Sequence, residues 1–240
     1  MDILIWCVTA LSLLIGCWIQ TALGFGLAVF AAPIIVILKP EWVPVLLTLT
    51  ALVLSVLNSW NQRADLELGE LGPAFITRIP GTIVGAWLLS QLNTAWLQIA
   101  VASCVLLAVI ISFLGKQFDY SPVRLGTAAF FSGITGTTTS IGGPPMALVM
   151  QHGQPKTVRA NLSVYFSYSC TLSLAGYAWM GLLSMEVLVS TLSFIPLALL
   201  GFFTGIKARA YVDAGRFRPL LLWLCGCTGV FALLGALSKF

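Results

Sequence analysis

The sequence predicts an all-α polytopic membrane protein, and three observations favour this class. Of the 240 residues, 59% are hydrophobic and 8% are charged, whereas a soluble domain carries about 25% charged residues. The mean hydropathy of the chain is +0.99. Its apolar runs are long enough to cross a bilayer as helices, for which about 20 residues suffice, and only short polar loops separate them. Such a chain has too little polar surface for water.

The first apolar segment, Ile3–Leu38, is too long for one membrane span and short for two. Polar residues and glycines interrupt it at Thr21–Gly26. A full helix, a break at this position and a short returning helix fit the length best. The first basic residue is Lys39, so the chain lacks the basic start of a secretory signal, and we interpret the segment as a retained span.

The remaining apolar segments alternate with short polar loops. The expected spans are Trp42–Trp60, Leu71–Ser90, Trp96–Gly115, Leu125–Met150, Ala160–Met180, Met185–Ile206 and Pro219–Leu237. The expected loops are Asn61–Glu70, Lys116–Arg124, Gln151–Arg159 and Lys207–Arg218. Basic residues beside spans are typical of membrane proteins, so the net charge of +4 does not indicate a nucleic-acid partner. We expect the most basic loop, Lys207–Arg218, to lie against anionic lipid headgroups.

The segment Leu125–Met150 contains a second break, near Thr137–Pro145. Pro144 and Pro145 remove two backbone N–H donors, and four glycines loosen the chain around them. Five hydroxyl side chains fall within six residues: Thr135, Thr137, Thr138, Thr139 and Ser140. In lipid, a broken backbone persists only where protein or a water-filled cavity satisfies its polar groups. The segment therefore predicts an interrupted helix that lines a site.

Residues 1–115 and 116–240 correspond to each other as two repeats. A shift of 116 residues superimposes four pairs: Thr21 on Thr137, Gly26 on Gly142, Pro80 on Pro196, and Gly85 on Gly201. We therefore predict a single membrane domain built from two repeats of four spans, each with a broken first segment. Broken segments at corresponding positions of two repeats indicate the binding site of a transporter.

Each broken segment can either cross the membrane once or return as a hairpin. With single crossings, the basic loop residues divide seven against four between the two sides. With hairpins, Lys39 and Lys239 oppose nine others: Arg63, Lys116, Arg124, Lys156, Arg159, Lys207, Arg209, Arg216 and Arg218. The positive-inside rule favours the hairpins, with both termini outside. Each half then has five segments, an odd number, so the halves form inverted repeats, as alternating access requires.

The two breaks predict a binding site for an anion. Helix N-termini that meet inside a membrane present free N–H groups and positive dipole ends, which bind anions. The returning helices start near Gly26 and Gly143. No acidic residue lies at the centre of a span, which favours an anion over a cation as cargo. The candidate binding residues are Gln20, Thr21, Gly24, Gly26, Arg78, Thr137, Thr138, Thr139, Ser140, Gly142 and Gly143.

Two alternatives remain open for these residues. The glycines and threonines can instead be small packing residues that let helices approach closely. Arg78, which is the only basic residue inside an expected span, either faces the cavity or extends to the headgroups.

The sequence offers no catalytic or metal-binding constellation. It contains no P-loop, GxSxG or HExxH pattern, so we expect a protein that is not an enzyme and needs no cofactor. The six cysteines lie in apolar segments without CxxC or zinc spacing, and we expect no metal site.

Residues around the two breaks resemble the signatures of the TauE/SafE sulfite exporter family. Gly24-Phe25-Gly26 with Pro33 resembles the first-half signature. Ser132-Gly133-Ile134-Thr135-Gly136 through Ile141-Gly142-Gly143-Pro144-Pro145 resembles the second. Members are linked to export or uptake of sulfite, sulfonates and other organosulfur anions across bacterial cytoplasmic membranes.

The resemblance, which covers the whole chain, implies a multi-pass secondary transporter of the bacterial inner membrane. Its cargo would be a small sulfur-containing anion, such as sulfite or a short organosulfonate. An anion channel or facilitator is an alternative, and a membrane-embedded enzyme or assembly factor ranks below it. Membrane lipid would surround the protein as a monomer or a homodimer.

Overall fold

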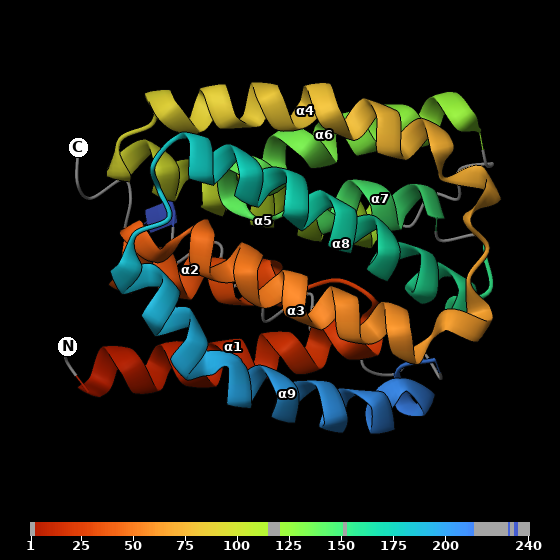
Figure 1. Ribbon diagram of the computed structural model, residues 1–240, viewed down its shortest axis with the longest axis horizontal. Coiled ribbons are helices and arrows are strands. Elements are labelled where there is room, and N and C mark those ends of the chain that lie inside the picture. The colour runs from red at the N-terminus through yellow and green to blue at the C-terminus, as the bar shows by residue number, and fades with distance from the viewer. Residues whose placement is uncertain (1–2, 115–120, 151–152, 214–229, 231–232, 235–240) are drawn as a thin grey trace.

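The computed structural model describes residues 3–114, 121–150, 153–213, 230 and 233–234, and Figure 1 shows their arrangement. These residues form an elongated bundle of helices whose axes run roughly along one direction, with no strand among them. The all-helical class predicted from composition is confirmed. The expected last span, Pro219–Leu237, lies outside the described residues except for Val230, Leu233 and Leu234.

Among the described residues, the first half of the chain contributes five α-helices and the second half four. They are α1 (Ile3–Leu23), α2 (Leu27–Leu38), α3 (Val45–Asn61), α4 (Gly72–Gln91), α5 (Thr94–Leu114), α6 (Pro122–Thr139), α7 (Gly143–Met150), α8 (Pro155–Trp179) and α9 (Met185–Asp213). Short 3-10 turns at Pro40–Trp42, Arg63–Asp65 and Leu68–Glu70 flank α3. The two breaks are narrower than the sequence indicated, since only residues 24–26 and 140–142 leave the helical conformation.

The first broken segment turns back on itself between α1 and α2. A Cβ atom added at Gly26 would lie 2.7 Å from Ile19 Cγ2, and one added at Gly16 would lie 2.8 Å from Leu27 Cδ1. Residues further before the turn thus contact residues further after it, so α2 runs antiparallel to α1. The glycines permit this approach because a larger residue would clash with the facing helix.

The second broken segment makes the same kind of turn between α6 and α7. Ser132 in α6 donates a hydrogen bond to the carbonyl oxygen of Gly142 at 2.6 Å, so the chain after the break returns along α6. The two turns also touch each other, because a Cβ atom added at Gly143 would lie 3.0 Å from Phe25 Cβ. The two breaks that correspond in the predicted repeat therefore meet inside the bundle.

Contacts at the two ends of the bundle show which helix termini lie at the same end. Lys39 after α2 forms an ion pair with Glu186 at the start of α9, with Nζ and Oε1 2.5 Å apart. Near the other end of α9, Arg209 donates to Asn61 Oδ1 at the end of α3, at 2.9 Å. Only the second broken segment lies between the partners of each pair along the chain. If it crossed the membrane once, each pair would lie on opposite sides, so both contacts require α6 and α7 to form a hairpin (Figure 1).

Helices α4 and α6 pack with their backbones in contact. A Cβ atom added at Gly81 would lie 2.3 Å from the Phe130 carbonyl oxygen, and one added at Gly133 would lie 2.7 Å from Gly81 Cα. Only glycine permits this separation, since any side chain would clash with the facing backbone. The contact brings Arg78, about one turn before Gly81, against α6.

Five basic residues that were expected in loops lie in α-helices instead: Arg124, Lys156, Arg159, Lys207 and Arg209. Helix α8 begins at Pro155 rather than Ala160, because proline suits the first turn of a helix, and Arg159 is buried within it. Helix α9 extends beyond Ile206 to Asp213. The loop prediction is therefore wrong for residues 207–213, where Arg209 binds other helices, and residues 214–218 lie outside the described part of the chain.

The outer surface of the bundle is apolar. Helices Ile3–Leu23 and Met185–Ala210 are each long and apolar enough to cross a membrane. Large apolar side chains such as Ile76, Ile83 and Phe203 are exposed around the bundle. A soluble monomer rarely exposes extended apolar patches, so this surface fits a lipid environment.

Candidate functional site

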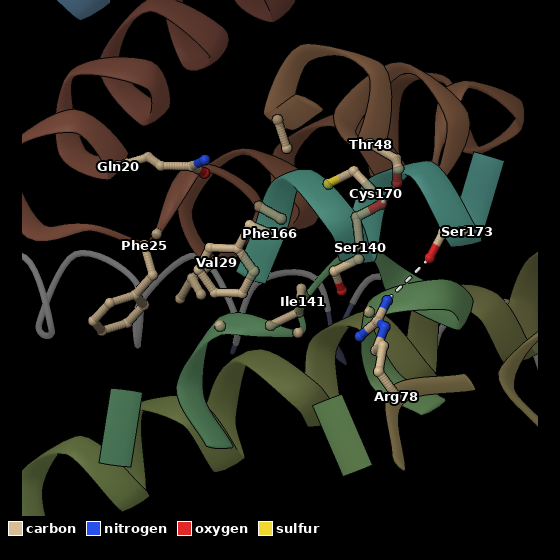
Figure 2. A pocket seen from close by; sticks show the side chains of 17 residues that line it. Gln20, Phe25, Val29, Thr48, Arg78, Ser140, Ile141, Phe166, Cys170 and Ser173 are labelled. Carbon is tan, nitrogen blue, oxygen red and sulfur yellow. Dashed lines mark hydrogen bonds between the residues drawn. The ribbon is translucent and has the colours of Figure 1, made fainter. Parts of the chain in front are cut away.

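A cavity of about 50 Å³ lies where the two turns meet (Figure 2). By this measure one water needs roughly 10–15 Å³, so the cavity has room for a small ion. Its polar lining consists of Gln20, Thr48, Arg78, Ser140, Ser169 and Ser173, together with the glycines of both turns. Phe25, Val29, Ile141 and Phe166 are among the apolar residues that complete the wall.

Arg78 of α4 supplies the positive charge of the cavity. Its side chain is only 2% exposed, so it faces the interior and does not extend to the headgroups. Among the described residues no carboxylate pairs with it, since the ion pair found there joins Lys39 and Glu186. A buried cation without a counter-ion is costly. An anion that enters the cavity would relieve this cost.

Hydrogen bonds from two helices hold the Arg78 guanidinium. Nη1 donates to the carbonyl oxygen of Ser132 and lies 3.2 Å from Ser132 Oγ. Nη2 donates to Ser173 Oγ at 3.0 Å. Nε is buried and has no hydrogen-bond partner among the described residues. The guanidinium is therefore fixed in place while part of its donor capacity remains unused.

The same serines connect Arg78 to the second turn. Ser173 Oγ and Thr137 Oγ1 are 2.9 Å apart, and Ser132 also donates to the carbonyl oxygen of Gly142 at 2.6 Å. The charge on α4, the C-terminal part of α6 and the end of the turn thus form one hydrogen-bonded group. A movement of the second turn would move Arg78 with it.

The N-terminus of α2 opens into the cavity. Gly26 precedes the helix with φ 122°, and no side chain caps it. The first backbone bond of the helix runs from Phe30 N to Gly26 O at 3.1 Å. The amide groups of residues 27–29 therefore have no helical partner, and Ala28 and Val29 line the cavity. These amides and the positive end of the helix dipole favour a bound anion.

The N-terminus of α7 contributes fewer donors than that of α2. Pro144 and Pro145 follow Gly143 directly and carry no N–H. The donor that this helix end presents to an anion is chiefly the amide of Gly143, which lines the cavity beside Gly142. The two helix ends, which correspond in the predicted repeat, are thus unequal as donors.

Ser140 ties the second turn to α3. It adopts a left-handed conformation with φ 64°, which is uncommon for a residue with a side chain. Its hydroxyl donates to the carbonyl oxygen of Pro44 at 2.9 Å and lies 3.1 Å from Thr48 Oγ1. The strained turn therefore holds the Ser140 hydroxyl at the cavity wall.

Six of the eleven residues proposed from sequence line this cavity: Gln20, Gly26, Arg78, Ser140, Gly142 and Gly143. The other five lie next to it. Thr21 Oγ1 accepts a hydrogen bond from Asn58 at 3.3 Å, and Gly24 packs against Arg159. These two residues position the first turn and do not face the cavity.

Three threonines of α6 likewise lie behind the cavity wall. Thr138 donates to the carbonyl oxygens of Ile134 at 2.8 Å and Gly85 at 3.1 Å. Thr139 donates to Thr135 O at 2.8 Å, and Thr137 pairs with Ser173 as described above. Most of these hydroxyls satisfy backbone carbonyls, which sequence alone does not show because threonine in a helix bonds either to its own turn or to a neighbour.

The sequence analysis missed the contribution of α8. Phe166, Ser169, Cys170 and Ser173 all line the cavity. Their spacing of three, four and seven residues places them on one face of a helix. The polar residues on one face of this otherwise apolar span were the sequence signal that could have indicated a cavity lining. Thr48 of α3 gave no comparable pattern.

A helical membrane bundle in which two broken helices turn back around a buried cation has the architecture of a solute transporter. The comparison with protein families agrees, since the model of the family described as sulfite exporter TauE/SafE matches residues 8–232. The chain belongs to this family, as the two signatures predicted. It is accordingly an integral membrane protein of a transporter family. Comparison with curated proteins and with solved structures gives no significant match.

Proposed function

We propose that this protein is a secondary transporter that moves a small sulfur-containing anion across the bacterial cytoplasmic membrane. The cargo is sulfite or a short organosulfonate. The observation that carries the proposal is Arg78, a buried guanidinium that faces a small cavity without a carboxylate partner among the described residues. The family, whose description names sulfite export, supports the same class of cargo.

The lining of the cavity supports a particular orientation of the anion. Figure 2 shows Arg78, Ser140 and Ser173 at one end of the cavity, and Phe25 and Phe166 toward the other. The oxyanion group binds at the polar end beside the guanidinium. To accept from Ser140, it replaces the Pro44 carbonyl oxygen as the acceptor of that hydroxyl. The short carbon chain of an organosulfonate lies against the aromatic side chains. Sulfite fills the polar end alone.

The proposed transport mechanism is alternating access between inverted halves. Each half supplies one turned-back segment to the cavity, and the turns touch at Phe25 and Gly143. Rocking of one half against the other would separate the turns on one side at a time and expose the anion there. The hairpin direction of both segments supports an inverted relation between the halves.

Ligand binding to the purified protein tests the proposal. We expect sulfite and short sulfonates to raise the melting temperature, while carboxylates of equal length raise it less. A ligand at 100 times its Kd stabilises the folded state by about 2.7 kcal/mol. Absence of a shift with every sulfur oxyanion would contradict the proposed cargo.

Flux into proteoliposomes then separates a carrier from a channel. A carrier gives saturable flux and exchange of labelled for unlabelled anion across the membrane. Flux that rises linearly with anion concentration and shows no exchange would favour the channel and contradict alternating access.

A further inference from the structure

A second group of polar side chains adjoins the central cavity. It comprises Gln20, Ser55, Asn58, Gln62, Arg159 and Ser163, which we call the polar seam. All six are buried, each with no more than 7% of its surface exposed. Polar groups are costly inside a membrane protein and usually mark a solute pathway. The proposed anion site does not account for the polar seam.

The polar seam begins at the cavity and leads toward the basic end of the bundle. Gln20 lines both the cavity and the polar seam, so the two spaces adjoin at this side chain. Arg159 lies in the second turn of α8 and Gln62 follows α3, so both are at the end of the bundle where Arg209 contacts Asn61. The positive-inside rule places this end in the cytoplasm.

The polar seam is closed in this structure. The space between its side chains leaves no volume for a water molecule. Gln20 Nε2 donates to Ser55 Oγ at 3.3 Å, which joins α1 to α3. Asn58 Nδ2 donates to Thr21 Oγ1, also at 3.3 Å. Both bonds are longer than the usual 2.7–3.2 Å, so water can replace them at small cost when the helices separate.

Arg159 lies at the cytoplasmic end of the polar seam against the first turn. Its Cγ atom is 3.0 Å from the position that a Cβ atom on Gly24 would take, and residues with a side chain rarely adopt the φ of 92° found at Gly24. The turn therefore covers the buried Arg159 side chain. A displacement of α1 that breaks the bond between Gln20 and Ser55 would uncover Arg159 and connect it with the cavity.

We propose that the polar seam is the closed cytoplasmic passage to the anion site, with the Gln20–Ser55 contact as its gate and Arg159 as a second anion-binding position. This inference rests on the proposed function. The anion would pass from Arg78 to Arg159, two guanidinium groups on opposite sides of Gln20. Small oxyanions of the same chemistry bind at both positions.

Cys170 provides a native reporter for this passage because it lines the central cavity. The other cysteines are replaced by alanine. Membrane-impermeant methanethiosulfonates are then added at the cytoplasmic face, and the rate of Cys170 labelling is measured. Ser55→Ala removes the acceptor of the Gln20 bond, and we expect labelling to become about two- to tenfold faster, the effect of one hydrogen bond. Thr50→Val is the matched control, since the Thr50 hydroxyl donates to the Leu46 carbonyl oxygen of its own helix α3 and lines neither the cavity nor the polar seam.

The charge of the reagent tests Arg159 separately. Arg159→Gln should slow an anionic sulfonatoethyl reagent roughly tenfold and leave a cationic trimethylammonium reagent unslowed, while Arg159→Lys restores the preference. Equal labelling rates in the Ser55→Ala and Thr50→Val proteins would overturn the gate. Equal slowing of both reagents would overturn the second anion position. Sulfite binding in detergent, compared between wild type and Arg78→Gln, tests the proposed function independently of either result.

Discussion

Replacement of Arg78 by glutamine separates anion binding from folding. In the wild type the guanidinium is 2% exposed and retains an unpartnered Nε beside the cavity. A hydrogen bond to a charged group contributes about 1.5–3 kcal/mol, which corresponds to an increase of about 10- to 150-fold in Kd when it is lost. We therefore expect sulfite affinity to fall by at least tenfold in Arg78→Gln.

The stability of the ligand-free variant should behave differently. Arg78→Gln loses the bonds to Ser132 and Ser173, but it also removes a buried charge that lacks a counter-ion. Burial of an isolated charge is costly, so its removal offsets part of the cost of the lost bonds. We expect the melting temperature without ligand to stay within about 4 °C of wild type, which corresponds to roughly 1 kcal/mol.

Calorimetric titration and thermal unfolding in the same detergent measure both quantities. Arg209→Gln is the matched control, because Arg209 ties α9 to Thr21, Asn58 and Asn61 outside the cavity. It should lower the melting temperature and change Kd less than threefold, which corresponds to about 0.6 kcal/mol. An unchanged sulfite Kd in Arg78→Gln would refute the reasoning and remove the cavity as the binding site.

Three further predictions follow from the packing and the hydrogen bonds. Gly81→Ala should abolish or severely reduce folded protein in fluorescence-detected gel filtration, because its Cβ would lie 2.3 Å from Phe130 O, whereas Gly72→Ala, which meets no atom within 4 Å, should not. Ser140→Gly removes the hydroxyl while tolerating φ 64°, and it should weaken sulfite binding several-fold by calorimetry. Thr138→Val should leave the sulfite affinity unchanged. Weaker binding in Thr138→Val than in Ser140→Gly would place the anion behind α6. Lys39→Ala breaks an ion pair whose Glu186 side chain is 68% exposed and should change the unfolding free energy by less than about 1 kcal/mol; a larger loss in denaturant titrations would mean that this pair holds the outer end closed.

The turned-back segments were predictable because each combines an apolar length with residues that interrupt a helix. Ile3–Leu38 exceeds one span, and the glycines after Thr21 mark where it turns. The loop charges distinguished hairpins from crossing helices. Boundaries near basic residues were less predictable: Arg159 and Arg209 sit in helices because buried or bonded guanidiniums can be held there by groups from distant segments, such as Thr21 O.

The candidate site was predictable as a region but not as a set of side chains. Gln20, Arg78 and Ser140 line the cavity, whereas Thr138 and Thr139 donate to backbone carbonyls. A hydroxyl that faces the cavity and one that donates to a backbone carbonyl cannot be distinguished from the sequence. Ser132 and Ser173, which hold Arg78, act through the close approach of α4 to α6 and α8, and that approach is a property of the folded chain.

The most direct test of the central claim is the position of a bound anion. Selenite resembles sulfite in shape and charge and scatters X-rays anomalously. In crystals soaked with selenite, we predict a selenium peak in the cavity, within hydrogen-bond reach of the Arg78 guanidinium and the first amides of α2. A selenium peak found solely on the protein surface, under conditions where calorimetry shows the anion bound, would contradict the account.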